Sequence, residues 1–242
     1  MGEWRHKILE SLSHNLLDAR CLMLGADSSE FEIVKKFKYE VFEFFHSFQG
    51  EGAHAGKSAF FIRLFGCPIR CPWCDSAGTW NSGGEPSVRK MSAAELADAA
   101  VAANPDFVVI TGGEPTIHDL APLCAALHAK KLRIHLETSG AFPIRGNVDW
   151  VTLSPKTRRT PLTENWTLAS ELKLIVTRPE DLVFWAEKIS RERISADAPI
   201  WVHPEWSQHK NPDVLGAISD WICSHGSPYR AGWQLHKLFN VR

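Results

Sequence analysis

The stretch "FVVITGGEP", residues 107–115, decides the fold class of this 242-residue chain. Its first four residues are apolar and predict a short buried strand, and a polar, glycine-rich segment follows them directly. A helix is predicted on either side. "SAAE" from Ser92 has the pattern of a capping box, and Asp119 can cap a second helix that runs to about Ala129. A buried strand between two helices is the repeating unit of a parallel α/β sheet.

The same alternation of strand and helix extends in both directions from this stretch. Strands are predicted at residues 39–45, 59–65, 133–137, 150–153, 171–176, 200–203 and 231–236. Helices are predicted at residues 180–190 and after Asn211, where Pro212 takes the first helical position and Gly226 ends the helix. No helix-length segment separates Glu137 from Trp150. We therefore expect an α/β fold that forms an incomplete, TIM-like β/α barrel.

Distinctive polar motifs follow the predicted strands. "TGGEP" comes after residues 107–110, "ETSG" after 133–136, "SPK" after 150–153, "HPEWSQ" after 200–202 and "HK" after 231–235. Parallel α/β sheets carry their chemistry at the carboxyl ends of the strands. We expect these motifs to converge on one rim.

The first 37 residues have a different pattern. Trp4, Ile8, Leu12 and Leu16 recur at helical spacing, which predicts an amphipathic helix up to about Leu24. The segment "GADSSE" then breaks the pattern. We expect an N-terminal helical extension over residues 1–37 and a main domain over residues 38–242.

Composition narrows the functional classes. Apolar residues make up 44% of the chain and charged residues 23%, as in an ordinary globular protein, and the formal net charge is −1. The only dense basic cluster is "KTRR" at residues 156–159, in which Arg158 and Arg159 are expected to be solvated, so no nucleic-acid partner is expected. No apolar run approaches the about 20 residues of a membrane span, and the N-terminus lacks a secretory signal. These features predict a cytoplasmic protein with no membrane partner.

The six cysteines fall into two groups. Cys21, Cys124 and Cys223 lie on apolar helical faces and are expected to be core residues. The other three, Cys67, Cys71 and Cys74, have the spacing C-x3-C-x2-C. So tight a triplet in a chain with few cysteines favours reduced thiols that bind a metal or react, rather than disulfides.

Three interpretations of this triplet are open from the residues alone. A structural zinc site needs a fourth ligand, for which His54, His118 or Cys124 is available. A redox pair of Cys71 and Cys74 leaves Cys67 unexplained. An iron–sulfur cluster can be held by three thiolates with one iron left open to another ligand.

The triplet, with Trp73 directly before its last cysteine, resembles the signature of the radical S-adenosylmethionine (radical SAM) superfamily. "TGGEP" resembles the superfamily's glycine-rich strand end, where glycine lets the backbone approach a ligand closely. Ser154 and Lys156 in "SPK" then become candidates for contacts with the nucleoside hydroxyls and the carboxylate of S-adenosylmethionine.

A second set of polar residues precedes the cysteines. "FQGEGAHAG" (residues 48–56) can be a simple hairpin, yet Gln49, Glu51 and Arg63 supply an amide, a carboxylate and a guanidinium. A carboxylate can accept two N–H donors from a guanidine-like heterocycle edge, and Arg can bind a carboxylate with two parallel hydrogen bonds. With "FIRLFGCPIRCPWCDS", "VVITGGEPTIHDL", "ETSG", "TLSPK" and "QLHKLFNVR", this motif resembles the 7-carboxy-7-deazaguanine synthase family over residues 38–242.

The resemblance implies an enzyme, a carbon–nitrogen lyase that converts 6-carboxy-5,6,7,8-tetrahydropterin into 7-carboxy-7-deazaguanine and ammonia by radical ring contraction. The pathway is that of 7-deazapurines such as queuosine. Its implied cofactors are a [4Fe–4S] cluster, S-adenosylmethionine and Mg2+. Its implied partners are the pterin substrate, a one-electron donor such as flavodoxin, and a second copy in a homodimer.

The resemblance also implies site residues. Cys67, Cys71 and Cys74 would hold the cluster and Ser76 would bind Mg2+; Trp73, Asp75, Gly113, Glu114, Ser154 and Lys156 would contact S-adenosylmethionine; Phe48, Gln49, Gly50, Glu51, Arg63, Thr111, His236 and Arg242 would contact the substrate. The chain departs from the family pattern at three of its positions. Ser76 stands for a common threonine, His203-Pro204 for a common Gln-Pro, and Arg242 for a small or apolar last residue.

Two alternative functions stay open at this point. The chain could be another small radical SAM enzyme, such as an activase that makes a glycyl radical on a partner protein. It could also be a non-enzymatic binding module stabilised by zinc.

Overall fold

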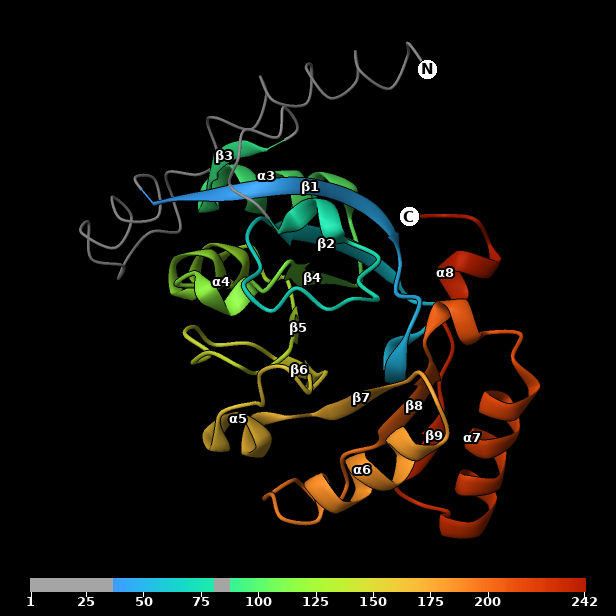
Figure 1. Ribbon diagram of the computed structural model, residues 1–242. Helices are drawn as coiled ribbons and strands as arrows, with labels where there is room; N and C mark the ends of the chain where they lie inside the picture. Colours follow the sequence, from blue (N-terminus) through green and yellow to red (C-terminus); the bar gives the residue numbers. More distant parts are fainter. Residues whose placement is uncertain (1–36, 81–87) are drawn as a thin grey trace, which may run out of the picture.

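The computed structural model describes residues 37–80 and 88–242, which form one curved sheet with helices along its outer side (Figure 1). Its strands and helices are β1 (Lys38–Phe48), β2 (Ser58–Leu64), β3 (Arg89–Ser92), α3 (Ala93–Ala103), β4 (Phe107–Gly112), α4 (Ala121–Ala129), β5 (Ile134–Thr138), β6 (Trp150–Leu153), α5 (Thr163–Leu168), β7 (Glu171–Val176), α6 (Glu180–Ile189), β8 (Ile200–Pro204), α7 (Pro212–His225), β9 (Tyr229–Ala231) and α8 (Leu235–Leu238). The predicted N-terminal helix, with Cys21, lies outside the described residues.

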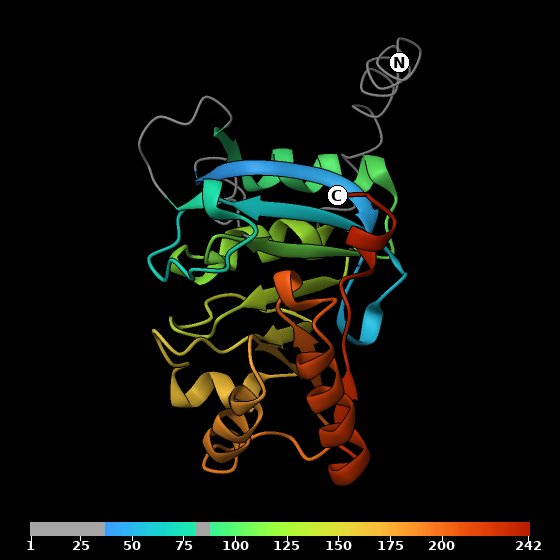
Figure 2. The ribbon, with the colours of Figure 1, turned by 45° about the vertical axis from the view of Figure 1, so that its right-hand side comes forward.

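The nine strands have the order β3-β1-β2-β4-β5-β6-β7-β8-β9. Strands β2 and β4 to β9 run parallel to one another, whereas β1 is antiparallel to both β2 and β3. The prediction of a parallel sheet is therefore wrong for its β3–β1 edge, because residues 49–57 turn the chain back as a hairpin. The end strands β3 and β9 do not pair with each other, so the barrel is incomplete, as predicted (Figure 2).

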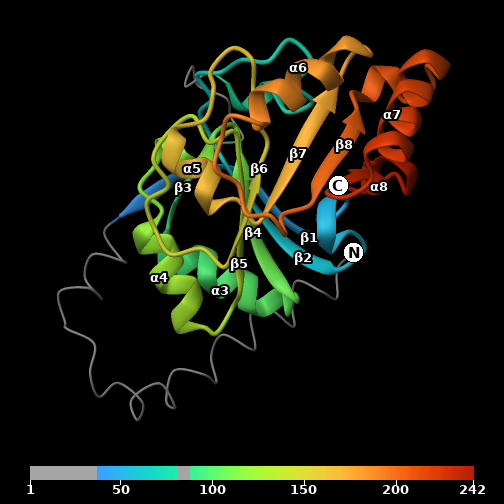
Figure 3. The same cartoon turned by 90° about the horizontal axis from the view of Figure 1, so that it is seen from below.

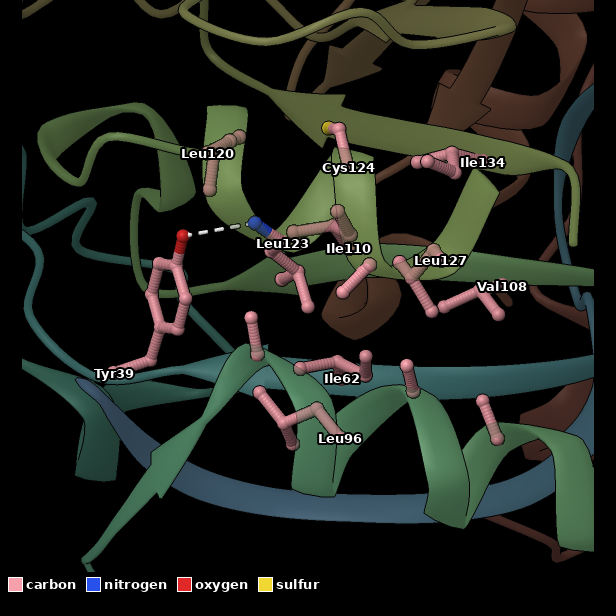
Figure 4. Packing of buried hydrophobic residues seen from close by; sticks show 14 of the residues in the cluster. Tyr39, Ile62, Leu96, Val108, Ile110, Leu120, Leu123, Cys124, Leu127 and Ile134 are labelled. Atoms are coloured by element: carbon pink, nitrogen blue, oxygen red, sulfur yellow. Dashed lines mark hydrogen bonds between the residues drawn. The ribbon is translucent and has the colours of Figure 1, made fainter. Parts of the chain in front are cut away.

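The larger core lies between the outer side of the sheet and helices α3 and α4 (Figure 4). Its central side chains are Ile62, Leu96, Val108, Ile110, Leu123 and Leu127, all of them fully buried. Tyr39 spans this core, since its hydroxyl donates to Asp119 O at 2.7 Å and accepts from the Leu123 N–H at 3.2 Å. The pKa of Tyr39 is raised above its usual value, mainly by burial.

Alternation along the later strands separates an apolar outer face from a polar inner face. On β7, Leu172 and Leu174 pack outward against Trp166 of α5 and Trp185 of α6. Because successive strand side chains point to opposite faces, Glu171 and Lys173 point into the curve of the sheet. Two charged residues are thus placed inside the incomplete barrel.

Most predicted helix ends are confirmed. Ser92 and Glu95 form the complete capping box at the start of α3. Asn211 caps α7, and Gly226 ends it. Leu120, rather than Asp119, occupies the N-cap of α4, although the Asp119 carboxylate still accepts from the Ala121 N–H at 3.0 Å.

Two predictions in the C-terminal part are wrong. Residues 231–236 are not one strand: β9 ends at Ala231, and Leu235 begins the short helix α8. Cys223 on α7 is exposed, whereas Cys124 is buried in the main core as predicted. Strand β3 and helix α5 were not predicted.

No helix in the described part of the chain is both long and apolar enough to cross a membrane.

Candidate functional site

A cavity of about 730 Å³ opens at the rim where the parallel strands end. Figure 3 shows β7 and β8 pointing towards the edge where the loops after β2 and β6 also lie. The strand-end motifs "TGGEP", "ETSG" and "SPK" all contribute lining residues, as do the three cysteines and the hairpin after β1. Residues 234–242, called the C-terminal segment below, also line the cavity. The predicted convergence of these motifs is confirmed, with one adjustment. "HK" reaches the cavity from α8 and not from a strand end.

Cys67, Cys71 and Cys74 are free thiols on one wall of this cavity. The Cys74 N–H donates to Cys71 O at 3.1 Å, and the segment packs through Ile69 and Cys71 against Ala141. Burial raises the pKa of the Cys71 thiol above its usual value, and the two neighbouring cysteines add to this, while Lys156 and Arg158 oppose it. A bound metal would supply the positive charge that thiolates need at such a place.

A structural zinc site would need a fourth ligand beside the three thiols. Within residues 37–80 and 88–242, no three His, Cys, Asp or Glu side chains surround a common point that could hold one ion. A tetrahedral zinc site needs its ligands around one centre, whereas a cluster takes each thiolate on a different iron. His54, His118 and Cys124, the candidates for a fourth zinc ligand, do not line the cavity.

Gly113, at the end of β4, lies directly against the cysteine segment. A Cβ atom added at Gly113 would lie 2.3 Å from Gly66 O and 2.8 Å from the Cys67 Cβ. The Gly113 and Glu114 N–H groups donate to Leu64 O and Gly66 O at 3.0 and 2.8 Å. Glycine is therefore required here by contact with the protein's own backbone, in addition to any contact with a ligand.

The Glu114 carboxylate is buried and occupied by protein donors. One oxygen accepts from the hydroxyls of Thr116 and Thr138, at 2.7 and 2.6 Å, and the other accepts from the Ser139 N–H at 2.9 Å and the Ser139 hydroxyl. This carboxylate ties the ends of β4 and β5 together and so fixes the shape of the rim.

Lys156 and Ser154 lie next to each other in the cavity wall, close to Trp73 of the cysteine segment. Lys156 Nζ donates to Ser154 Oγ at 2.6 Å and lies 5.1 Å from the centre of the Trp73 ring. Burial, with a contribution from the Lys173 ammonium, lowers the pKa of Lys156 to about 8. The three side chains thus combine a cation, a hydroxyl and an aromatic face, which suits a ligand with a carboxylate, hydroxyls and a planar base.

The hairpin after β1 brings Gln49 and Glu51 to the inner wall. Gln49 Nε2 donates to Glu137 Oε1 at 3.0 Å, and Glu51 accepts from Lys173 Nζ and from Gln234 Nε2 at 2.7 Å. Burial alone would raise the pKa of Glu51, but the Lys173 ammonium holds it well below its usual range. The hairpin and pocket interpretations of this segment are therefore compatible.

Lys173 is the central residue that the sequence analysis missed. Its ammonium lies between Glu51 and Glu137, with Nζ 3.3 Å from Glu137 Oε2. Burial would lower the pKa of Lys173, but these carboxylates keep it above its usual value. A signal was present in the sequence, because a lysine that alternates with leucines in a strand between helices must point into the barrel.

Glu171 holds the tip of the same hairpin. Its carboxylate accepts from Thr152 Oγ1 at 2.7 Å, Trp201 Nε1 at 2.8 Å and the Ala53 N–H at 2.8 Å. Ala53 belongs to a short 3-10 turn, Gly52–His54, inserted below the cavity. This anchor positions Gln49 and Glu51, and it too was not predicted.

Arg63 belongs to a row of alternating charges along the rim. Arg63 Nε donates to Glu43 Oε1 at 2.9 Å, and its Nη1 lies 3.2 Å from Ser76 Oγ. Ser76 Oγ donates to Asp75 Oδ1 at 3.2 Å, and Asp75 accepts from Lys237 at 2.9 Å. Burial opposes ionisation of Asp75, but Lys237 holds its pKa below the usual value. Thr111 lines the cavity nearby.

The C-terminal segment covers one side of the cavity. The Leu235 N–H donates to Gly50 O at 3.0 Å, and a Cβ at Gly50 would lie 2.1 Å from His236 Nδ1. Phe239 packs edge-on against Phe48, with ring centres 5.6 Å apart. Burial lowers the pKa of His236. Gly50 and Phe48 therefore dock this segment as well as lining the cavity.

The last residue, Arg242, is held by β1 from both its main chain and its side chain. Its main-chain oxygen accepts from Ser47 Oγ at 2.6 Å. Its guanidinium lies 3.3 Å from Glu43 Oε2, so Glu43 is shared between Arg242 and Arg63. The charged last residue thus has a counter-ion.

His203 does not line the cavity. It is fully buried against Gly232, and neither ring nitrogen has a hydrogen-bond partner in the described part of the protein. Burial lowers the pKa of His203 to about 4, so the ring is neutral. The adjacent Pro204 does reach the cavity wall.

Comparison with known proteins gives consistent relatives. The radical SAM superfamily model matches residues 61–159. The 7-carboxy-7-deazaguanine synthase of Synechocystis sp. is 47% identical over 204 residues, which cover 84% of this chain and 94% of the relative. That of Escherichia coli K12 is 32% identical over 226 residues, covering 84% and 99%. A crystal structure of QueE from Escherichia coli superposes with a TM-score of 0.76 at 29% identity, covering 87% of this chain and all of the other.

Proposed function

Because this chain belongs to the 7-carboxy-7-deazaguanine synthase family of radical SAM enzymes, we propose that it makes 7-carboxy-7-deazaguanine and ammonia from 6-carboxy-5,6,7,8-tetrahydropterin. The pathway is queuosine biosynthesis. One observation carries the proposal. The cysteine triplet, the "SPK" pair and the set Gln49, Glu51 and Arg63 line a single cavity. Residues 38–242 contain every residue that the proposal uses.

The cluster side of the cavity would be formed by Cys67, Cys71 and Cys74. When bound, the [4Fe–4S] cluster and S-adenosylmethionine supply the radical chemistry that starts the ring contraction. Lys156 and Ser154 would bind the polar groups of S-adenosylmethionine, and Trp73 would provide a flat contact for its base. Gly113 keeps the end of β4 against the cysteines, while Glu114 holds the strand ends in place. Asp75, which pairs with Lys237, would add a carboxylate to this side.

The substrate side would be formed from the hairpin, Arg63 and the C-terminal segment. Arg63 would bind the substrate carboxylate, since a guanidinium can make two parallel hydrogen bonds to it. Gln49 and Glu51, supported by Lys173, would bind the polar edge of the pterin, with Thr111 beside them. Phe48, Gly50, His236 and Arg242 would hold the C-terminal segment over the cavity and keep water out.

Mg2+ is proposed to bind at Ser76. Its hydroxyl lies beside the Asp75 carboxylate, and hard oxygen donors of this kind suit Mg2+, which keeps several of its waters. The Arg63 guanidinium is close to the same hydroxyl. We therefore expect weak Mg2+ binding without substrate and tighter binding once a substrate carboxylate neutralises Arg63.

Three further properties belong to the same proposal. The enzyme would take its electron from a one-electron donor protein such as flavodoxin. It would act as a homodimer, and it would work in the cytoplasm, where thiols stay reduced. A nucleic-acid partner is not part of the proposal, since the product is a small molecule.

The test is anaerobic reconstitution with iron and sulfide, followed by assay with the pterin, S-adenosylmethionine, Mg2+ and dithionite. We expect iron and sulfide in the protein and 7-carboxy-7-deazaguanine among the products by mass spectrometry. Cys71→Ala should lose both. Iron-loaded protein that makes no deazaguanine would contradict the proposal. Cleavage of S-adenosylmethionine only with a second protein would point to an activase, and zinc without iron to a binding module.

A further inference from the structure

Lys237 lies where the cofactor side and the substrate side of the cavity meet. It belongs to α8 in the C-terminal segment, and it lines the cavity. Its Nζ donates to Asp75 Oδ2 at 2.9 Å, a contact across 162 residues of sequence, and to Gln234 Oε1 at 2.8 Å. One ammonium thus connects the loop after the cysteines to the C-terminal segment. The proposed function gives this lysine no role of its own.

A chain of hydrogen bonds continues from Lys237 to the substrate side. Gln234 accepts from Lys237 through Oε1 and donates through Nε2 to Glu51 Oε1 at 2.7 Å. The other oxygen of Glu51 accepts from the Lys173 ammonium. The chain therefore runs without a break from Asp75, beside the cysteines, to the carboxylate that is proposed to bind the pterin.

The Lys237 side chain is held in this position by an aromatic ring as well. Its Nζ lies 4.9 Å from the centre of the Trp206 ring, and Trp206 is stacked on His209 with ring centres 4.3 Å apart. A cation over an aromatic face is attracted to it. Two hydrogen bonds and one ring thus fix the ammonium, and the side chain is only 19% exposed. Lys237 is therefore an ordered part of the cavity and not a solvated surface lysine.

The C-terminal segment depends on such polar contacts because it has little apolar packing. Helix α8 is partly or fully exposed along its whole length, and Phe239 and Val241 after it are exposed too. Segments with few buried apolar contacts open easily. The pair of Lys237 and Asp75 adds little to stability by itself, since the Asp75 side chain is 56% exposed. Its position at the junction of the two sides therefore points to a role in binding.

We propose that Lys237 is a positioning residue that couples the two sides of the cavity, so that S-adenosylmethionine and the pterin each strengthen the binding of the other. The inference rests on the proposed function, which places Asp75 on the S-adenosylmethionine side and Glu51 on the pterin side. S-adenosylmethionine fixes Asp75 and, through Lys237, orders Gln234. The pterin then meets a Glu51 that is already in place and loses less conformational entropy on binding. Such coupling is reciprocal by thermodynamic necessity.

Two other roles for Lys237 predict different behaviour. A lysine that only contacts one ligand would, when removed, weaken that ligand by the same factor whether or not the other is present. A lysine that only supports the fold would, when removed, weaken both ligands and lower the thermal midpoint. Coupling is measured separately from both, as the ratio of the affinities with and without the other ligand.

The experiment measures this ratio by calorimetry on the anaerobic holoenzyme at saturating Mg2+, with the cluster left oxidised so that no turnover occurs. S-adenosylmethionine is titrated with and without 6-carboxy-5,6,7,8-tetrahydropterin, and the pterin with and without S-adenosylmethionine. Lys237→Met keeps the apolar stem, Lys237→Arg keeps the charge, and Gln234→Ala breaks the chain at its next contact. The matched control is Lys188→Met on α6, because Lys188 also pairs with a carboxylate, Glu192 at 3.6 Å, but does not line the cavity.

We expect the unmodified enzyme to bind each ligand about tenfold more tightly in the presence of the other. Lys237→Met and Gln234→Ala should each reduce this factor to about twofold, the part that direct contact between the ligands supplies, and the double variant should reduce it no further. Lys237→Arg should keep most of the coupling, since a guanidinium also pairs with a carboxylate. Lys188→Met should leave it unchanged.

A second measurement needs no pterin. S-adenosylmethionine alone should slow amide hydrogen exchange in residues 234–242 of the unmodified enzyme, because it fixes the Asp75 end of the chain of hydrogen bonds. The same addition should have little effect on this segment in Lys237→Met. Mass spectrometry of the exchanged protein would report both cases.

Several results would overturn the inference. An unchanged coupling ratio in Lys237→Met would do so, as would an equal loss in Lys188→Met. Weaker binding of both ligands with a lower thermal midpoint, unrestored by Lys237→Arg, would assign a structural role to the lysine. Loss of affinity for one ligand by the same factor in both titrations would make Lys237 a direct ligand contact. A pterin that neither binds nor reacts would contradict the proposed function, while the exchange measurement would still test Lys237.

Discussion

Gln234 donates a side-chain hydrogen bond of 2.7 Å to Glu51, which lies 183 residues earlier in the sequence. This contact joins the C-terminal segment to the hairpin that carries the proposed pterin ligands. The same segment is joined to the hairpin by the Leu235 N–H, which donates to Gly50 O. The contacts that hold the C-terminal segment over the cavity therefore also position Glu51.

Replacing Gln234 with alanine should weaken substrate binding more than it slows the chemical step. A hydrogen bond to a charged group contributes about 1.5–3 kcal/mol, so KM for the pterin should rise about tenfold or more. The value of kcat should change less, because the cysteines and Lys156 are not touched. Steady-state kinetics with dithionite would measure this. A fall in kcat at constant KM would show that the contact acts on chemistry and not on closure.

The buried pair of Glu51 and Lys173 should behave as a unit. Lys173→Met leaves Glu51 and Glu137 without their shared counter-ion, which should reduce the free energy of unfolding by about 3–5 kcal/mol. The double variant with Glu51→Gln should recover part of this loss, because one of the two stranded carboxylates is removed. Urea unfolding of both single variants and the double variant gives the coupling energy. Additive effects of the two substitutions would contradict the pairing.

The lowered pKa of Lys156 predicts a dependence of stability on alkaline pH. In the unfolded chain a lysine has a pKa of about 10.5, whereas burial lowers that of Lys156 in the folded protein to about 8. Between these values the unfolded chain binds the proton and the folded protein does not. The free energy of unfolding contributed by Lys156 therefore rises as pH increases from about 8 to 10.5 and is constant below that range.

The measurement for Lys156 is urea unfolding of the unmodified protein and of Lys156→Met across this pH range. The difference between the two proteins isolates the lysine from other groups that titrate there. We expect the methionine variant to have the smaller gain in stability with rising pH. Equal gains in the two proteins would show that Lys156 titrates normally in the folded state.

The sequence was informative about strands and about the rim, because both follow from local patterns. Apolar runs located β4, β6 and β7, and the polar motifs behind them converged as the rule for parallel sheets requires. The direction of β1 was not predicted. Residues 49–57 could be interpreted as a hairpin or as a binding loop. They form a hairpin, and its residues Gln49 and Glu51 line the cavity.

The missed residues depend on contacts between distant segments. Lys173 pairs with Glu51 across 122 residues, and nothing near either residue in the sequence indicates its partner. Residues 231–236 alternate like a strand, but the Leu235 N–H bonds to Gly50 O, so the chain turns into α8 instead of extending β9. Cys223 follows an apolar helical spacing at a place where α7 remains exposed. Tertiary contacts decide all three cases.

Gly113 should be essential for assembly of the cysteine site. Gly113→Ala places a Cβ atom against Gly66 O and the Cys67 Cβ, and a backbone oxygen cannot move aside as a flexible side chain can. We expect iron content to fall to less than about half after reconstitution, while circular dichroism remains close to that of the unmodified protein. Gly216→Ala on α7 is the matched control. Nothing lies within 4 Å of its added Cβ, and alanine favours a helix. Equal iron content in the two variants would contradict this role for Gly113.

Ser76 should determine the need for Mg2+. Ser76→Ala removes the proposed protein ligand, so the Mg2+ concentration for half-maximal activity should rise about tenfold or more, whereas Ser76→Thr keeps the hydroxyl and should leave it nearly unchanged. The alanine variant also frees the Arg63 Nη1 group from its contact with Ser76. KM for the pterin at saturating Mg2+ therefore has to be measured alongside. A higher Mg2+ requirement with the same KM supports a metal ligand. An unchanged Mg2+ requirement with an altered KM would mean that Ser76 serves to orient Arg63 for the substrate carboxylate.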